Sequence, residues 1–398
     1  MHPAWRARIE RALAERRAKS LYRERRVLDS PQGARVVIEG REYLNFSSND
    51  YLGLAADPRV IEAMNEAARL YGAGSGAAHL VSGHLRIHHE LEERLAEFLG
   101  RERALLFSSG YMANLGIGAA LLKRGDAVFE DRLNHASLID AGLASGARFA
   151  RYRHNDGVDL AARLANAEEA MRLVMTDGVF SMDGDLAPLN EIAAIAERHE
   201  ACLVVDDAHG IGVLGENGRG TLEHFAVIDR VPVLMGTLGK ALGSFGAFVA
   251  GEGALIELLI NEARTYVYTT ALPPAAAAAA IAALEIVERE PERRAGLRAK
   301  VKLFQDGLRA LGLPVPESIT PIQPIVLGSA EAALAAAHRL REAGMLVPAI
   351  RPPTVPPGTA RLRVSLSTAH GEEDIARLLE ALSRLGLGAR RNMRQSAR

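Results

Sequence analysis

A lysine in a glycine-rich turn is the first residue of this sequence that could do covalent chemistry. Lys240 lies between two short apolar stretches that we interpret as strands, 233–236 and 246–250, with Gly239 and Gly243 on either side. Glycines let a backbone bend sharply and let a flat ligand approach closely. A lysine amine is costly to bury as a cation, so an apolar setting favours a nucleophilic amine suited to a Schiff base. The alternative is a surface lysine on a flexible hairpin.

A second stretch upstream of Lys240 favours the covalent interpretation. Residues 201–206 form an apolar run that ends in acid at Asp206 and continues to His209 and Gly210. Ligands bind at the carboxyl ends of strands in open α/β sheets. An acid in that place suits the carboxylate that pairs with the pyridine nitrogen of pyridoxal phosphate. The two stretches together therefore predict a pyridoxal phosphate site.

Three more polar loops follow apolar stretches that we expect to be strands. Ser108–Tyr111 precedes a helix, so its backbone N–H groups can hold a phosphate. Asn134–Ser137 and Asp177–Asp185 follow the next strands. A single histidine is usually structural, but His135 and His209 share a position after strands. Parallel topology would gather these loops at one edge of the sheet, and we therefore expect both histidines in one site.

Composition narrows the class of protein. The chain has 398 residues, 48% hydrophobic and 24% charged, with a net charge of -1. No global basic field is present to attract nucleic acid or an anionic membrane. The single cysteine, Cys202, excludes an internal disulfide framework and fits a reducing compartment. With neither a signal-peptide pattern nor a membrane-length apolar run, we expect a cytoplasmic protein without a membrane partner. No metal site is predicted.

The order of apolar stretches predicts an α/β fold with a large, mostly parallel, seven-stranded sheet. The N-terminal segment is expected to hold a helix over 4–26 and a β-pair over 34–46 that turns at Glu39-Gly40. Helices are expected from Asp57-Pro58 onward and over 87–99. The strands of the sheet are expected at 104–107, 127–130, 148–152, 173–176, 203–206, 233–236 and 246–250. Only the Lys240 turn joins the last two, so one of them should be antiparallel.

A smaller α+β domain is expected after an alanine-rich helix over 275–288. Its helices are expected near 293–311 and 330–344, and its strands near 322–327, 346–350 and 361–367. We therefore divide the chain into an N-terminal arm (1–50), a large cofactor-binding domain (51–288), a small C-terminal domain (289–388) and a disordered basic tail (389–398).

Several longer motifs carry a resemblance to a known family. The runs are Asn45–Leu54, Gly178–Asp185, Asp206–Gly210 and Gly236–Lys240. In these the chain resembles the α-oxoamine synthases, pyridoxal phosphate enzymes of the aspartate aminotransferase fold (fold type I). The match covers about 16–387. A further run, Arg351–His370, resembles the subgroup that condenses L-alanine with a pimeloyl thioester to 8-amino-7-oxononanoate in biotin biosynthesis.

The resemblance implies a role for each matching position. Lys240 would hold the cofactor covalently and move protons at the substrate α-carbon, and Asp206 would hold the pyridinium proton. His135 would stack on the ring face, contact the substrate and help acid catalysis. The remaining implied contacts are the phenolate oxygen (His209, Ser181), the phosphate (Gly110, Tyr111, Thr237), a neighbouring subunit's phosphate (Thr269, Thr270), the amino acid carboxylate (Asn49, Arg363) and the acyl substrate (Arg23, Thr354).

Two positions depart from the family pattern, and some features of the reaction stay open. Asp177 stands where the family usually has glutamate, and His79 where many members have arginine. The implied partners are L-alanine, the pimeloyl thioester and a second copy of the chain in a homodimer. The acyl carrier is either coenzyme A or acyl carrier protein. The alternatives are an α-oxoamine synthase that uses glycine or another acyl group, and a pyridoxal phosphate-binding regulator without activity.

Overall fold

The computed structural model describes residues 1–387, so the tail predicted over 389–398 lies outside the described residues. The chain divides into two compact units. Unit 2 comprises residues 49–297, and unit 1 comprises residues 1–48 with the described part of 298–398. The N-terminal segment groups with the C-terminal one because β2 (Arg41–Asn45) pairs with β11 (Met345–Leu346). The boundary falls inside α12 (Pro291–Ala310).

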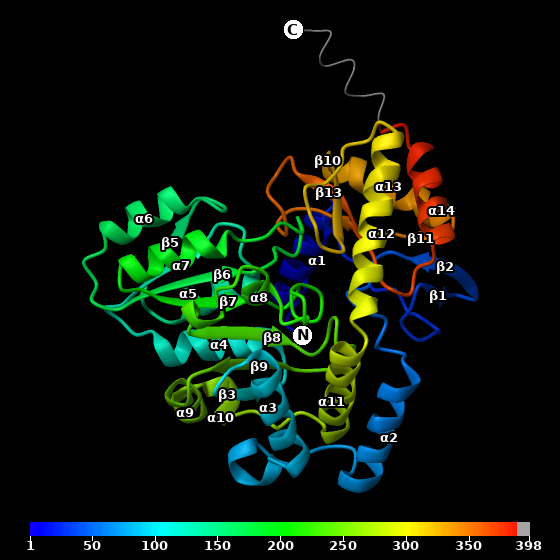
Figure 1. The fold of residues 1–398 in the computed structure, drawn as a ribbon. Coiled ribbons are helices and arrows are strands. Elements are labelled where there is room, and N and C mark those ends of the chain that lie inside the picture. Colours follow the sequence, from blue (N-terminus) through cyan, green and yellow to red (C-terminus); the bar gives the residue numbers. More distant parts are fainter. Residues whose placement is uncertain (388–398) are drawn as a thin grey trace. The chain divides into compact units, whose positions relative to one another are not determined.

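Unit 2 is built on the predicted seven-stranded sheet (Figure 1). Its strand order is β3-β9-β8-β7-β6-β4-β5. Their bounds are β3 (Arg103–Phe107), β4 (Ala127–Asp131), β5 (Arg148–Tyr152), β6 (Arg172–Asp177), β7 (Cys202–Asp206), β8 (Val233–Thr237) and β9 (Ala247–Gly251). Each lies within one residue of its predicted limits. Only β9 runs antiparallel to its neighbours, β3 and β8, as the short Lys240 connection requires.

One face of the sheet forms a core with α4 (Gly110–Leu121), α5 (Ala136–Ala144) and α9 (Gly253–Glu262). Alternate strand residues point into this core, because side chains on a strand alternate between its two faces. The strand side of the core includes Leu105, Phe107, Val128, Leu173, Met175, Val204, Val233, Met235 and Val249. Apolar packing on this scale holds the strand ends rigid, which lets the loops beyond them carry polar groups.

The other helices of unit 2 are short or amphipathic. They are α2 (Pro58–Tyr71), η1 (His79–Gly83), α3 (Arg86–Leu99), α6 (Gly157–Ala165), α7 (Leu189–Arg198), α8 (Thr221–His224), η2 (Ile228–Arg230), α10 (Arg264–Val267) and α11 (Pro274–Arg289). Helix α2 starts where predicted, because the Asp57 carboxylate accepts a hydrogen bond from the Arg59 backbone N–H at 3.0 Å. Most alanines of α11 are buried and let it pack closely against α2.

Unit 1 holds two three-stranded sheets. One is β1-β2-β11, with β1 at Arg35–Ile38, and the other is β10-β13-β12, with β10 at Ile322–Gly328, β13 at Ala360–Ser365 and β12 at Ala349–Ile350. Its helices are α1 (Pro3–Ala18), α13 (Ala330–Glu342), α14 (Glu372–Ser383) and the C-terminal part of α12. The predicted β-pair is present, and its turn residues Glu39 and Gly40 have φ values of 51° and 74°.

Two predictions for unit 1 were wrong in detail, and one helix was missed. Helix α1 ends at Ala18 rather than near 26, because Ser20 takes a left-handed φ of 57°. The strand expected over 346–350 is two short strands, and they belong to different sheets. Helix α14 was not predicted at all, although its apolar residues Ile375, Leu378 and Leu382 recur at helical spacing. Within residues 1–387, no helix has the length and apolar character needed to cross a membrane.

A partly buried charge cluster joins the ends of β4 and β5 in unit 2. His154 lies between two acids, with Nδ1 2.9 Å from Asp131 Oδ1 and Nε2 2.7 Å from Asp185 Oδ2. Burial of the ring opposes its charge, but the hydrogen bonds and charges of Asp131 and Asp185 outweigh burial and raise the pKa of His154 to about 10. Asp131 is fully buried and accepts backbone hydrogen bonds from Leu133 and Asn155, and His154 supplies the cation beside its charge.

We predict that His154→Gln lowers the free energy of unfolding by about 3 kcal/mol at pH 7, since it leaves a buried carboxylate without its cation. The native pKa is raised above the unfolded value of about 6.5. This stabilisation is therefore complete below pH ~6.5 and is lost as the pH rises through about 10. Urea unfolding of both proteins at pH 7 and pH 10 measures the difference. An equal difference at both pH values would contradict the assignment.

Candidate active site

The loops that follow β3, β4, β6, β7 and β8 enclose a cavity of about 220 Å³. Its lining residues are Gly110, Tyr111, His135, Ser137, Asp177, Asp206, Ala208, His209, Met235, Thr237 and Lys240. All five polar loops singled out in the sequence thus contribute residues to one place. The meeting point is the carboxyl end of the central strands β6, β7 and β8, where open α/β sheets bind ligands.

Of the two acids at the end of β7, Asp206 is the one that lines the cavity. Its Oδ2 accepts a hydrogen bond from Asn114 Nδ2 at 2.8 Å, and its Oδ1 accepts one from the Ala208 backbone N–H at 3.0 Å. The side chain is only 4% exposed. A buried carboxylate needs such donors, because an unpaired one would be very costly to remove from water. These contacts hold the carboxylate in a single orientation.

The neighbouring Asp207 is enclosed elsewhere in unit 2. Its Oδ2 accepts a hydrogen bond from the Thr221 backbone N–H at 2.6 Å. A Cβ atom added at Gly178, Gly210 or Gly220 would lie within 2.8 Å of an Asp207 carboxylate oxygen. The Asp207 carboxyl group therefore fits only because these three positions have no side chain. Burial raises the pKa of Asp207 to about 8, which favours its neutral form and a packing role.

His135 is the N-cap residue of α5, and two contacts set its position. Its backbone N–H donates to Asp177 Oδ2 at 2.6 Å. Its ring Nδ1 lies 2.7 Å from Ser137 Oγ and accepts from the Ser137 backbone N–H at 3.3 Å. Burial lowers the pKa of His135, an effect that the Asp206 charge opposes and Lys240 reinforces. A neutral ring whose Nδ1 accepts must carry its proton on Nε2.

Asn114 of α4 connects Asp206 to His135. Its amide nitrogen lies 2.8 Å from Asp206 Oδ2 and 2.8 Å from Ser137 Oγ, so each N–H can serve one acceptor. Since the Ser137 hydroxyl accepts from Asn114, its own proton is available for His135 Nδ1. A continuous hydrogen-bond chain therefore runs from the carboxylate through Asn114 and Ser137 to the imidazole. The four residues are held as one group.

Asp177, the shorter acid at a position where glutamate was expected, is fully buried beside Asp206. Burial, together with the Asp206 charge, raises the pKa of Asp177 well above its ordinary value. Its backbone N–H donates to Asn134 Oδ1 at 3.1 Å, while its carboxyl group accepts from the His135 backbone. The neutral form avoids repulsion between two carboxyl groups on adjacent strands. The shorter side chain still reaches a position that fixes His135.

The N-terminus of α4 and the Thr237 hydroxyl supply groups suited to an anion. Gly110 and Tyr111 are the first two residues of α4, and their N–H groups belong to the first turn, which has no carbonyl partner within a helix. Ser109 caps the helix by accepting from the Met112 N–H at 3.3 Å. Thr237 Oγ1 donates to the Gly246 carbonyl at 3.0 Å and accepts from the Gly239 N–H at 3.2 Å.

The glycines around Lys240 serve packing more than ligand approach. Gly243 has a φ of +62°, and a Cβ there would lie 2.3 Å from the Ala55 backbone nitrogen. A Cβ at Gly236 would lie 2.3 Å from the Phe248 ring. These glycines let the turn fold tightly against its surroundings, which holds Lys240 half-buried at the cavity.

His209 is linked to a residue that the sequence assigned to the substrate. Its Nδ1 lies 2.8 Å from Tyr51 Oη, which in turn lies 3.1 Å from Asn49 Oδ1. Tyr51 is fully buried and was not predicted as a site residue. It holds the His209 ring and the Asn49 side chain in one group.

The other predicted site residues lie outside this cavity. Among the described residues that line it, Ser181, Thr269 and Thr270 do not appear. Thr269 and Thr270 follow α10, and Thr270 is exposed. In unit 1, Arg23 Nη2 donates to Thr354 Oγ1 at 3.2 Å, so the two residues assigned to the acyl substrate are neighbours. Arg363 lies buried in β13, with Nη1 2.8 Å from Ser365 Oγ.

Comparison with known proteins identifies the family. A family model described as aminotransferase class I and II matches residues 41–382. This chain belongs to that family. An 8-amino-7-oxononanoate synthase of Thioalkalivibrio sulfidiphilus is 62% identical over 378 residues, which cover 94% of this chain and 96% of that protein.

Two solved structures have folds similar to that of this chain. A variant of serine palmitoyltransferase from S. paucimobilis with a bound PLP-myriocin aldimine has a TM-score of 0.91 and 32% sequence identity, and the match covers 96% of this chain and 98% of that one. An 8-amino-7-oxononanoate synthase from Francisella tularensis has a TM-score of 0.75 and 34% identity over 86% of this chain and 97% of that one. The aminotransferase fold predicted from the sequence is confirmed.

The donor set of the cavity fits pyridoxal phosphate. The group carries a pyridine nitrogen, a phosphate and an aldehyde, which call for a carboxylate, an anion site and an amine. Asp206, the first turn of α4 and Lys240 provide these three in one cavity. The flat His135 ring is available for stacking.

Three members of this site were missed from the sequence: Asn114, Ser137 and Tyr51. A polar residue inside an otherwise apolar helix, as Asn114 is, was the available signal. Ser137 and Tyr51 lay within motifs already noted, but no spacing shows which atoms they contact.

We predict that Asn114→Leu lowers kcat/KM by about 10–100-fold, because Asp206 loses a hydrogen bond to a charged group worth roughly 1.5–3 kcal/mol. Ser137→Ala should have a smaller effect, since it leaves the contact between Asn114 and Asp206 in place. Steady-state kinetics of the two variants and the wild type measure these effects. Thermal unfolding checks that each variant is folded. A folded Asn114→Leu protein with unchanged kcat/KM would show that this chain of hydrogen bonds has no functional role.

Proposed function

We propose that this chain condenses L-alanine with a pimeloyl thioester to give 8-amino-7-oxononanoate, carbon dioxide and a free thiol, a step of biotin biosynthesis. The observation that carries the proposal is the cavity in which Lys240, Asp206, His135 and the start of α4 converge. Relatives that match nearly the whole chain at 56–62% identity are named 8-amino-7-oxononanoate synthase. We infer the substrates from the name of these relatives. The cavity contains side chains that are suited to the chemistry.

The chain's own residues have distinct tasks in this proposal. When bound, pyridoxal phosphate supplies an electron sink for the bond that breaks at the alanine α-carbon. Lys240 holds the cofactor and then, with its amine free, takes the α-proton. Asp206 keeps a proton on the ring nitrogen through its negative charge. His135 stacks on the ring, contacts the substrate and helps acid catalysis through its Nε2 proton. His209 and Ser181 contact the phenolate side of the cofactor.

The bond changes balance with one proton from solvent and no other reactant. The α-carbon of alanine bonds to the acyl carbon, the carbon–sulfur bond breaks, and the thiolate leaves and takes up that proton. The carboxylate then departs as carbon dioxide, and the carbon that it leaves is protonated by Lys240. We assign the alanine carboxylate to Asn49 and Arg363 and the acyl chain to Arg23 and Thr354, whose side chains are hydrogen-bonded to each other.

We further propose a cytoplasmic homodimer in which Thr269 and Thr270 reach the phosphate bound by the neighbouring subunit. Both threonines are absent from the residues that line their own chain's cavity in the described part of the structure. The thiol carrier is either coenzyme A or acyl carrier protein. An α-oxoamine synthase that prefers glycine or another acyl group is the alternative.

Mass spectrometry of products tests this function directly. Alanine and glycine are each offered with several acyl thioesters of different chain lengths, and thiol release is followed in parallel. The proposal predicts the product of alanine and the pimeloyl thioester above all others. A preference for glycine or another acyl chain would support the alternative. Bound cofactor without thiol release would show a binding protein instead of an enzyme.

For Asp206→Asn, we expect the rate of chemistry to fall by ~10²–10⁴-fold, which corresponds to roughly 3–5 kcal/mol of transition-state stabilisation. The amide keeps the size of the side chain but loses the charge, and that charge matters most as electrons flow into the ring. Single-turnover thiol release with alanine and the thioester measures the step.

Asp207→Asn is the matched control for this variant. The two acids are adjacent, but burial already favours the neutral form of Asp207, and its side chain does not line the cavity in the described structure. The single-turnover rate of Asp207→Asn should stay near that of the wild type. Equal losses in the two variants would mean that the ring partner has been assigned wrongly.

The homodimer has its own test. We predict that sedimentation at assay concentration shows a single species of twice the chain mass, with an interface of the large obligate kind. An active monomer would contradict the shared site, since Thr269 and Thr270 could not then reach another chain's phosphate. Thr269→Ala should lower cofactor affinity in the dimer without changing its mass.

A further inference from the structure

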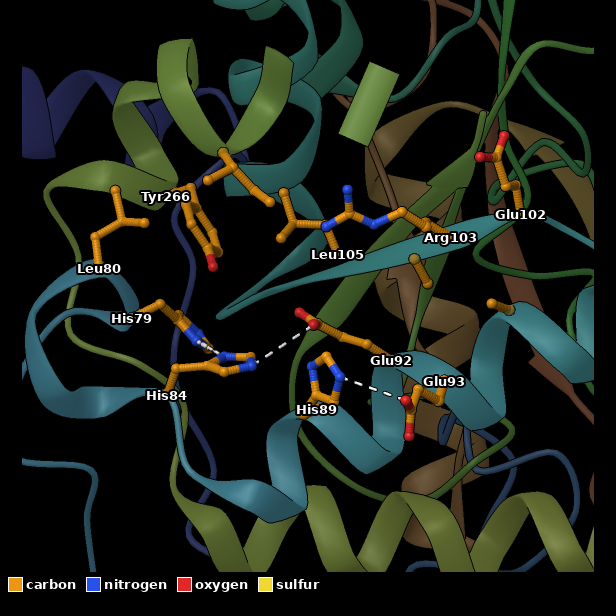
Figure 2. Close-up of a pocket in the computed structure, with 13 residues that line it drawn as sticks. His79, Leu80, His84, His89, Glu92, Glu93, Glu102, Arg103, Leu105 and Tyr266 are labelled. Carbon is orange, nitrogen blue, oxygen red and sulfur yellow. Dashed lines mark hydrogen bonds and ion pairs between the residues drawn. The ribbon is translucent and has the colours of Figure 1, made fainter. Parts of the chain in front are cut away.

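A second cavity of unit 2, of about 460 Å³, is lined by His79, His84 and His89, which form a histidine cluster with His88 near the start of α3 (Figure 2). His79 comes from η1, His84 from the connection to α3, and His88 and His89 from the first turn of α3. Glu92 follows on the same helix. Within residues 1–387, this cavity shares no lining residue with the one that contains Lys240. The reaction proposed above gives these side chains no task.

Three of these side chains have the arrangement of a metal-binding set. His84, His89 and Glu92 each offer a ligand atom, and the three atoms lie within 4.8 Å of one another. His84 Nε2 is 3.9 Å from Glu92 Oε2, and Figure 2 shows the two side chains pointing toward each other. His89 and Glu92 are three residues apart, which places them on one face of α3. The carboxylate is 12% exposed and the His84 ring 30% exposed, so the set is reachable from the cavity.

His88 is a poorer ligand than its neighbours. Its Nδ1 accepts from the Leu85 backbone N–H at 3.0 Å, and its Nε2 lies 2.9 Å from the Leu272 carbonyl. Both ring nitrogens are thus engaged with the backbone. An ion could take His88 only by breaking one of these bonds, so His88 serves as a link between α3 and the segment before α11.

Each of the three candidate ligands has a group that orients it. His84 Nδ1 lies 2.9 Å from His79 Nδ1, so a proton on one nitrogen is shared with the other. His89 Nε2 lies 3.4 Å from Glu93 Oε1. Glu92 Oε1 accepts from the Leu106 backbone N–H at 3.0 Å. Polar contacts of this kind are the usual support of the ligands in metal sites of proteins.

His79 is itself fixed by a ring contact. Its imidazole stacks on Tyr266 with centroids 5.0 Å apart and an interplanar angle of 14°. As a neutral ring it can accept the Nδ1 proton of His84, which leaves the lone pair of His84 Nε2 directed at Glu92. The arginine expected at position 79 has no acceptor and could not do this. The histidine at position 79, where many family members have arginine, therefore orients His84 for metal binding.

We propose that His84, His89 and Glu92 bind one divalent transition-metal ion of the zinc type. Zinc takes nitrogen at about 2.0–2.1 Å and oxygen at about 2.0–2.2 Å in a tetrahedral arrangement, so its ligand atoms lie about 3.3–3.5 Å apart. The 3.9 Å between His84 Nε2 and Glu92 Oε2 has to shorten only slightly. Two histidines and one carboxylate leave the fourth position to water from the cavity.

Zinc titration of the full-length, untagged enzyme with pyridoxal phosphate bound is the test. After treatment with chelator and its removal, Zn²⁺ is added in competition with a chromophoric chelator. We expect one ion per chain, with a dissociation constant below about 1 µM. Cofactor absorbance should not change on addition of the ion, because the two cavities are separate. Dissociation constants above about 100 µM would overturn the proposal.

Variants locate the bound ion. Glu92→Gln keeps an acceptor for the Leu106 N–H, so the fold is retained while the charged ligand is lost. His79→Phe keeps the stack on Tyr266 but removes the acceptor for His84. Loss of an orienting partner weakens metal binding by about 10–100-fold, which is expected for His79→Phe, and Glu92→Gln should lose at least as much.

His338 of unit 1 provides a matched control, because it is an exposed helical histidine whose Nδ1 lies 3.5 Å from Glu342 Oε2, four residues along. His338→Asn should bind zinc as the wild type does. Equal zinc affinity in Glu92→Gln and the wild type would overturn the proposal. So would a loss of affinity in His338→Asn, because the ion would then be bound elsewhere.

Discussion

The buried carboxylate of Asp206 is the constraint on which the rest of this site depends. β6, β7 and β8 are adjacent parallel strands, and their register places Asp177 beside Asp206 and Asp206 beside Met235. Two acids therefore meet at the end of the sheet, away from water. Such a pair is stable only if one carboxyl group is neutral and the other is hydrogen-bonded or faces a cation. The raised pKa of Asp177, the Asn114 amide and Lys240 meet these needs.

The same constraint explains why the polar groups form connected sets. The Asn114 amide donates hydrogen bonds to both Asp206 and Ser137, and the Ser137 hydroxyl is hydrogen-bonded to His135. Tyr51 similarly joins His209 to Asn49. Chains of this kind hold side chains in one orientation, and active sites need that precision more than they need flexibility. The apolar core below the strand ends makes the precision possible, because it keeps those ends from moving.

Most of the fold could be predicted from the sequence, since apolar runs of strand length alternate with helices across unit 2. The runs that became β3 to β9 and the cluster of Asp206, His135 and Lys240 were therefore found. Asn114 was missed because its function depends on which way α4 faces. The end of α1 and the split between β11 and β12 depend on local backbone geometry and tertiary pairing, which no periodicity records. The set of His84, His89 and Glu92 was missed because a loop brings His84 back onto α3.

Peptide mapping after borohydride reduction tests most directly whether the cavity beyond β7 and β8 is where the cofactor binds. Reduction fixes pyridoxal phosphate to whichever amine it is bonded to, and proteolysis with mass spectrometry then finds the modified residue. The account predicts one label per chain, on Lys240, and its absence from a Lys240→Ala protein. A label on Lys123, Lys300 or Lys302 in the wild type would contradict it.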